Sequence, residues 1–314
     1  MIAYISKQGG ELREFDGQDD AVWINVYPPF EHGELDGLAT AMDVPLDFIT
    51  DSLDIDERSR YEKEDNSTFI LINSPILNDD SKDSEAIYIT VPIGIILTAD
   101  HIITVCSKEN PILEKFYENK VKNFDPSDRS LFVLQIFEQN VFRFLECLKK
   151  LNLKRNLIEQ ELYHSSRNSE LQQLLRIEKS LVYFVSSLSA NELVKMKIKR
   201  TDLLHIGNEE RYADLFEDII IDNSQALEMS NVYTNILSGT MEAYASIVSN
   251  NLNVIIHRLT IVTIILLVPS MVASFYGMNL DYLPFKTLKY AFPFIILISI
   301  LLGFGVVYYF SRRK

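Results

Sequence analysis

Residues 253–279, NVIIHRLTIVTIILLVPSMVASFYGMN, decide the fold of this 314-residue chain. From Leu259 to Leu280 the sequence carries no charged side chain. A helix needs roughly 20 mostly apolar residues to cross a lipid bilayer, and this run meets that length. A second uncharged run, 290–311, follows after a short loop. Two such spans joined by a short loop predict a membrane hairpin.

The polar residues of the first span follow a helical spacing. The repeating positions are Asn253, Ile256, Thr260, Thr263, Leu267, Ser270 and Ser274. They step by three and four residues, which places them on one face of a helix. One alternative is a packing seam, because small hydroxyl residues also join membrane helices. The other is a lining that faces water, and since two spans cannot enclose a water path, a lining requires several chains in a ring.

The sequence ahead of the spans changes character near residue 125. Residues 1–125 have an α/β pattern, with strands expected at 21–27, 68–72, 87–91, 95–97 and 102–105. Helical spacing covers 38–53, where Pro45 starts a second short helix. Asp125 and Pro126 then predict the cap and first position of a long helix. A second long helix is expected around 171–188, after a polar break at 165–169.

A third helix begins near Asn208 or Glu209 and meets no proline before Pro269. If it continues into the first span, residues 209–275 form one helix of 67 residues, about 100 Å long. Such a helix is expected to act as a stalk that couples the preceding domain mechanically to the membrane.

Composition narrows the class of protein. The net charge of −14 argues against a nucleic-acid partner. The first residues lack the basic start and apolar stretch of a signal peptide, so the domain ahead of the spans is expected in the cytoplasm. Arg258 and 312–314 are basic at the expected inner side, which places both termini inside. Cys106 and Cys147 are expected to be buried thiols. The sequence contains no catalytic motif, so an enzyme is not expected.

The end of the first span carries a family signature. Tyr276-Gly277-Met278-Asn279, with Leu259-Thr260-Ile261, Pro269 and 281–284 nearby, resembles the signature of the CorA family of magnesium transporters. The resemblance implies an α+β cytoplasmic domain with a long stalk helix, then a two-helix transmembrane hairpin, assembled as a homopentameric ring in the cell membrane. The expected boundaries are 1–125 (α/β domain), 126–207 (helical hairpin), 208–255 (stalk), 256–276 (first span, pore-lining), 277–290 (outer loop), 291–311 (second span) and 312–314 (basic cytoplasmic tail).

The same resemblance implies an activity and an ion entrance. Hydrated Mg²⁺ would pass inward down its electrochemical gradient, with Co²⁺, Ni²⁺ and Zn²⁺ as further candidate cargo. Gly277, Asn279 and Asp281 would form the entrance, where amide oxygens of Asn279 accept hydrogen bonds from the water shell that Mg²⁺ releases reluctantly. Ile256 and Leu267 would narrow the path and gate it by dewetting. Phe285 departs from the family, which commonly has an acid there.

The stalk carries a candidate regulatory Mg²⁺ site. Leu215-Phe216-Glu217-Asp218 resembles the family stretch in which an aspartate binds a regulatory ion. Asp218 and Asp222 share a helix face, where like charges repel. Asp83, in the acidic loop 79–83, is the expected facing partner. A bound cation would relieve the repulsion, and its loss would open the channel.

Two alternatives remain beside the magnesium channel. A zinc transporter of the same superfamily would share the architecture, although Met278 favours the magnesium branch. A membrane-anchored sensor or scaffold would conduct nothing, although a simple anchor needs no polar face.

Overall fold

The computed structural model describes residues 1–31, 33–64, 66–78, 85–162, 168–206, 209–278, 284 and 289–312. The chain divides into two compact units, Met1–Met241 and Glu242–Lys314. Helix α6 (Glu210–Tyr276) contributes residues to both units.

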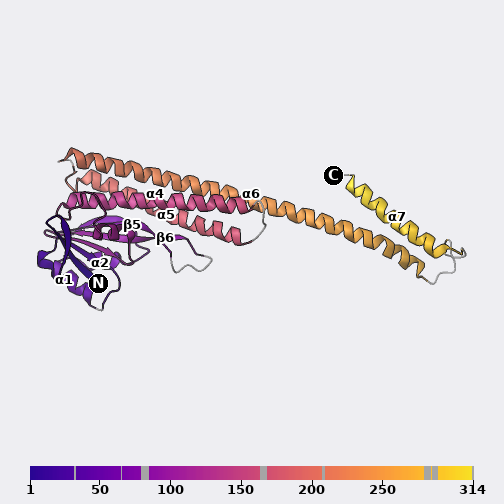
Figure 1. Ribbon diagram of the computed structural model, residues 1–314, viewed down its shortest axis with the longest axis horizontal. Coiled ribbons are helices and arrows are strands. Elements are labelled where there is room, and N and C mark those ends of the chain that lie inside the picture. Colours follow the sequence, from indigo (N-terminus) through magenta and orange to yellow (C-terminus); the bar gives the residue numbers. More distant parts are fainter. Residues whose placement is uncertain are drawn as a thin grey trace. The chain divides into compact units, whose positions relative to one another are not determined.

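The first unit is built on a seven-stranded sheet with the order β2-β1-β3-β7-β6-β5-β4 (Figure 1). Its strands are β1 (Ile2–Gln8), β2 (Glu11–Phe15), β3 (Trp23–Val26), β4 (Arg60–Glu64), β5 (Ser67–Leu77), β6 (Tyr88–Leu97) and β7 (Ile102–Cys106). Strands β3 and β7 pair in parallel, with Trp23 opposite Ile102, and the other neighbouring pairs of described strands are antiparallel. The structure confirms strands in all five predicted segments and joins two of those segments in β6.

Alternating residues of the central strands supply two cores. On β5, Ile70 and Ile72 belong to one buried cluster, whereas Phe69 and Leu71 belong to the other. Successive side chains of a strand point to opposite faces, so a run of apolar residues buries both faces of the sheet. Helices α1 (Glu34–Met42) and α2 (Leu46–Asp51) line the second cluster, and Pro45 directly precedes α2 as predicted.

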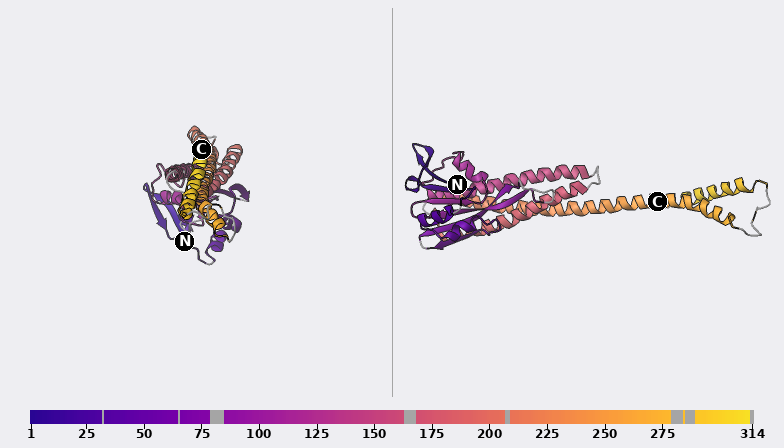
Figure 2. Two further views of the ribbon diagram at one scale, coloured as in Figure 1. Left: turned by 90° about the vertical axis from the view of Figure 1, so that its right-hand side faces the viewer. Right: turned by 90° about the horizontal axis from the view of Figure 1, so that it is seen from below.

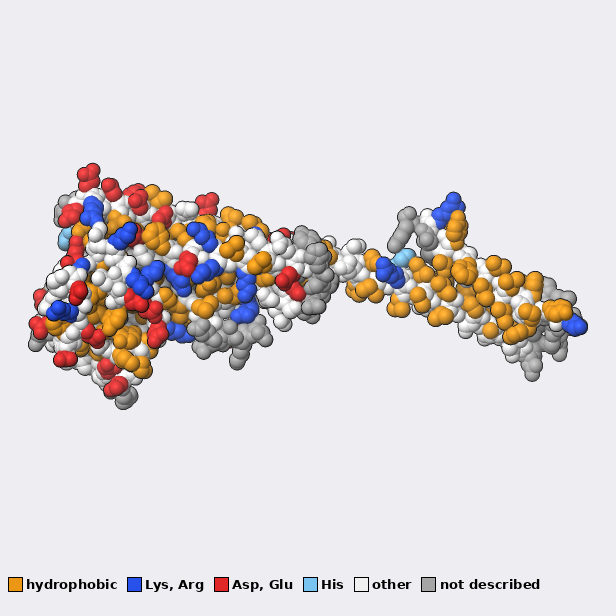
Figure 3. Space-filling model, viewed as in Figure 1, with side chains coloured by type: hydrophobic (Ala, Val, Ile, Leu, Met, Phe, Trp, Pro, Cys, Tyr) orange, Lys and Arg blue, Asp and Glu red, His pale blue; other side chains and the backbone are white. Residues whose placement is uncertain are grey.

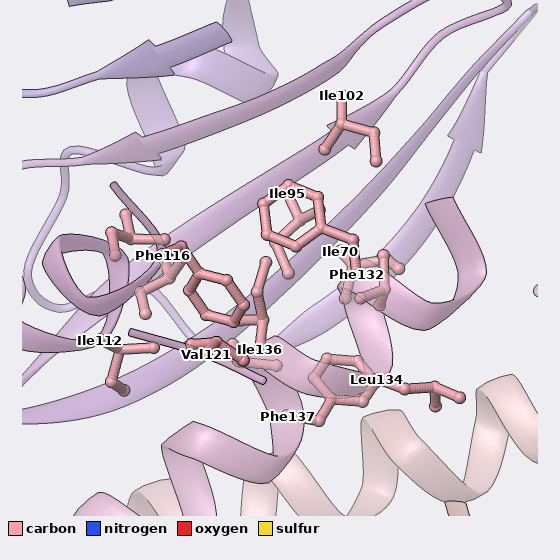
Figure 4. Close-up of a cluster of buried hydrophobic side chains, with 14 of the residues drawn as sticks. Ile70, Ile95, Ile102, Ile112, Phe116, Val121, Phe132, Leu134, Ile136 and Phe137 are labelled. Atoms are coloured by element: carbon pink, nitrogen blue, oxygen red, sulfur yellow. The ribbon is translucent and has the colours of Figure 1, made fainter. Parts of the chain in front are cut away.

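The first cluster holds the sheet to the long helices. Its side chains come from the strands, from α3 (Pro111–Tyr117) and from α4 (Arg129–Leu162). Figure 4 shows Phe116 of α3 and Phe132 of α4 among the strand residues Ile70, Ile95 and Ile102. Helices α4, α5 (Asn168–Thr201) and the first part of α6 lie side by side, as Figure 1 and Figure 2 show from different directions.

The predicted start of the first long helix was wrong. Asp125 accepts a hydrogen bond from the backbone N–H of Ser127 at 3.0 Å, which closes a local turn instead of capping a helix. Asp128 accepts from the N–H of Leu131 at 3.0 Å, and α4 begins at the next residue, Arg129. The predicted break at 165–169 lies partly outside the described residues, and α5 begins at Asn168.

The second unit consists of the last part of α6 and helix α7 (Ala291–Ser311). Helix α6 runs without a break through Pro269 to Tyr276, close to the predicted bounds. By length and composition, α6 and the segment Phe292–Tyr309 of α7 could each cross a membrane. Hydrophobic side chains cover much of the visible face of this unit, whereas Asp and Glu gather on the first unit (Figure 3).

Candidate ion pathway

The repeating positions of the first span lie on α6 and are all exposed. They are Asn253, Ile256, Thr260, Thr263, Leu267, Ser270 and Ser274. Because α6 is helical throughout, their spacing of three and four places them on one face, named here the polar face. The described part of the chain therefore leaves the polar face uncovered.

A different stripe of α6 is less exposed. Its half-buried members are Val254, His257, Ile261, Ile264, Val268, Val272 and Tyr276. Helix α7 has a matching stripe that includes buried Ser299 and Gly303. The helices meet at Gly303, where a Cβ atom would lie 3.9 Å from the carbonyl oxygen of Ile265. Ile265 is not on the polar face, so this contact leaves the polar face exposed in the described chain.

The hydroxyl groups of the polar face have a defined orientation. The Thr260 hydroxyl donates to the carbonyl of Ile256 at 2.8 Å, and the Thr263 hydroxyl donates to the carbonyl of Leu259 at 2.9 Å. Each hydroxyl proton is therefore used inside the helix, and the oxygen keeps lone pairs that can accept. Water molecules around a cation donate hydrogen bonds outward, so this arrangement fits a hydrated cation.

The end of α6 is closed by backbone bonds. The Gly277 N–H donates to the carbonyl of Ala273 at 2.9 Å, and the Tyr276 hydroxyl donates to the carbonyl of Pro284 at 3.0 Å. Gly277 has no positive φ, so a left-handed backbone is not the reason for glycine at this position. The predicted entrance residues Asn279 and Asp281 lie outside the described residues.

The acidic residues of the stalk do not converge within one chain. Asp218 is exposed and Asp222 is half-buried on α6, and Asp83 lies outside the described residues. The described residues contain no group of three or more His, Cys, Asp or Glu that could hold a metal ion. Burial raises the pKa of Glu138 on α4, and the negative charge of Asp222 raises that pKa further. A regulatory ion at Asp218 would therefore need ligands from elsewhere, such as another copy of the chain.

A buried lysine lies between the long helices and was not predicted from the sequence. Lys195 of α5 is 0% exposed, and its Nζ donates to Oδ1 of Asn223 on α6 at 2.7 Å. The ammonium lies 5.7 Å from the ring centroid of Phe137 on α4. Burial lowers the pKa of Lys195 to about 7, and the carboxylate of Glu192 offsets part of that shift. The available signal was its helical spacing from the buried residues Leu181 and Leu188 of α5.

Comparisons with known proteins agree with this architecture. The family model described as CorA-like Mg²⁺ transporter protein matches residues 18–313. The cobalt/magnesium transport protein CorA of Methanocaldococcus jannaschii is 25% identical, over 99% of this chain and 98% of that protein. The magnesium transport protein CorA of Helicobacter pylori is 22% identical, over 98% of this chain and 95% of that protein.

The fold is also that of a solved structure. The complete structure of the CorA magnesium transporter from Methanocaldococcus jannaschii matches with a TM-score of 0.80 and 22% identity. The match covers 100% of this chain and 98% of that one. This confirms the predicted order of an α/β domain, a long helix and a C-terminal helix that could cross a membrane. The family match extends over most of the sequence, and the chain therefore belongs to the CorA-like Mg²⁺ transporter family.

Proposed function

We propose that this protein carries Mg²⁺ across the cell membrane, in the direction of the cytoplasm, as a ring of identical chains. The observation that carries the proposal is the uncovered polar face of α6, directly ahead of Tyr276-Gly277-Met278. Membership of the family supports it, as do relatives named for magnesium and cobalt transport. Because these relatives are named as transporters, the comparison supports a transport function for this chain instead of an enzymatic one. The names mention magnesium and cobalt, so they do not favour zinc as the main cargo.

Along the proposed path the ion keeps its water shell. Hydroxyl oxygens of Thr260, Thr263, Ser270 and Ser274 accept hydrogen bonds from the shell, so dehydration is not required. Ile256 and Leu267 present apolar rings that close the path when water leaves. With both termini in the cytoplasm, Asn279 and Asp281 form the outer entrance. A divalent ion moving inward gains about 4.6 kcal/mol per 100 mV of membrane potential, so no ATP is needed.

Regulation by cytoplasmic Mg²⁺ belongs to the same proposal. Asp218 is exposed, so it could share an ion with Asp83 of another copy. Asp222 lies near Glu138 and is the alternative ligand. A bound ion would offset the repulsion between carboxylates and keep the ring closed. Loss of the ion would restore the repulsion, and the continuous helix α6 would transmit the change to Ile256.

The test is ion flux from purified full-length protein in liposomes under an imposed potential, with Mg²⁺, Co²⁺, Ni²⁺ and Zn²⁺ compared. We expect Mg²⁺ and Co²⁺ to enter. If only Zn²⁺ enters, the alternative hypothesis of a zinc transporter is correct. If no ion enters, the alternative hypothesis of a non-conducting scaffold is correct.

Thiol labelling tests the pathway itself. In a background without Cys106 and Cys147, the variants Thr260→Cys and Thr263→Cys should react with small water-soluble thiol reagents. Ile261→Cys, on the half-buried stripe, is the matched control and should react slowly. Equal labelling of both faces would contradict a water-lined polar face.

A further inference from the structure

Helix α6 is continuous but lacks one bond of its hydrogen-bond ladder. Pro269 lies inside the helix and has no N–H group, so the carbonyl of Ile265, four residues earlier, loses its helical donor. In a lipid environment an unsatisfied carbonyl costs several kcal/mol unless a neighbouring helix, a side chain or water supplies a partner. Helices also bend most readily at such positions.

Helix α7 places a buried glycine against this carbonyl. A Cβ atom at Gly303 would lie 3.9 Å from the oxygen of Ile265, which is the nearest atom it would meet. Gly303 belongs to the buried stripe of α7, together with Ser299, which is 4% exposed. Two residues further along, a Cβ at Gly305 would meet nothing within 4 Å. The two glycines of the same helix therefore have opposite surroundings.

We propose that Gly303 is a positioning residue for ion passage, because it lets α7 lie against α6 at the carbonyl that Pro269 leaves without a donor. Small residues allow membrane helices to approach closely, and the contact covers the place where α6 can bend. Thr260 and Thr263 precede that place, whereas Ser270 and Ser274 follow it. The contact would thus keep the two parts of the polar face in line, and this inference rests on the proposed function of that face.

The first test compares side-chain size at two glycines. In Gly303→Ala the methyl group fits at ordinary contact distance, so Mg²⁺ flux should stay close to that of the wild type. In Gly303→Leu the larger side chain must push α7 away from the Ile265 carbonyl. We expect flux to fall by about tenfold, equivalent to about 1.4 kcal/mol in the barrier. Gly305→Leu is the matched control and should conduct normally.

The second test reads the alignment of α6 without relying on flux. Single cysteines from Thr263→Cys and Ser270→Cys report on the two sides of Pro269, and the ratio of their labelling rates is measured. Gly303→Leu should change this ratio, and Gly305→Leu should leave it unchanged. If both leucine variants give the wild-type ratio, or if both change it equally, Gly303 has no special positioning role.

A further variant decides the case in which Gly303→Leu does not assemble. Pro269→Ala restores the donor to the Ile265 carbonyl and should also change the labelling ratio. If Pro269→Ala keeps the wild-type ratio and flux, the interrupted ladder has no role and the inference is overturned. Absence of Mg²⁺ flux in the wild type would instead contradict the proposed function, while the labelling ratio would still report on Gly303.

Discussion

Replacing Lys195 by methionine should remove a pH dependence from the stability of the first unit. The ammonium is buried between α4, α5 and α6, and it donates a hydrogen bond to the Asn223 side chain. Methionine keeps much of the length and volume of lysine but does not titrate. The charged group that acts on Lys195 is the carboxylate of Glu192 on α5, and it remains in the variant.

The size of the effect follows from the two pKa values. The pKa of Lys195 is about 7 in the folded chain, against an ordinary value of 10.5 when unfolded. Between these values the unfolded chain binds a proton that the folded chain has released, so the free energy of unfolding rises with pH. Below pH 7 both states hold the proton and the contribution is flat. The slope is at most about 1.4 kcal/mol per pH unit, which gives about 2 kcal/mol between pH 7 and pH 9.

The assay is thermal unfolding of the full-length protein in detergent at pH 7, 8 and 9. For a unit of this size, about 2 kcal/mol corresponds to a Tm difference of about 4–8 °C. The wild type should gain this much relative to Lys195→Met as the pH rises. Lys197→Met, an exposed neighbour on α5, should follow the wild type. If Tm changes with pH in the same way in the wild type and in Lys195→Met, the ammonium is not desolvated and the lowered pKa of Lys195 is refuted.

Three further outcomes are expected. Asn279→Ala should abolish Mg²⁺ flux while the assembly persists in size-exclusion chromatography, and normal flux in the assembled variant would remove Asn279 from the mechanism. Asp218→Ala should weaken the protection that Mg²⁺ gives against proteolysis; the regulatory site is wrong if the variant that also carries Asp222→Ala behaves like the wild type. Gly94→Ala should destabilise the protein by about 1–3 kcal/mol in thermal unfolding, because its methyl group would lie 1.8 Å from Oγ of Ser52. Adding Ser52→Ala should recover part of that loss.

The sequence predicted where strands lie better than how long they are. Strand β5 continues past the predicted 68–72 to Leu77, although it contains Pro75 and pairs with Pro92 of β6. Proline normally marks an edge or a bulge, because it cannot donate to the ladder. Here Asn73 lies opposite Pro92, and side chains from the helices bond its backbone instead. The N–H of Asn73 donates to Oδ1 of Asn191 at 2.9 Å, and its carbonyl accepts from Asn191 at 2.8 Å.

The candidate sites could also be predicted only where they depend on local sequence. A face of α6 could be predicted because helical spacing is a local property of the sequence. The surroundings of Lys195 could not, since they combine Phe137 of α4 with Asn223 of α6, and nothing in the local pattern pairs these positions. The contact between Gly303 and Ile265 likewise depends on how two helices meet.

The structure bears on the choice between a packing seam and a water-facing lining. Within the described chain, Gly303 of α7 lies against the backbone of Ile265, which is not on the polar face, and Ile261 and Ile264 are half-buried while the polar face is exposed. A polar face left bare in a lipid-facing position would gain nothing from its hydroxyl groups. We infer that this face meets water or another copy of the chain. A seam between copies would shield Thr260 and Thr263 as fully as Ile261, whereas a water path would leave only the polar face open to reagent. The labelling contrast between these positions thus separates the two alternatives that spacing alone leaves open.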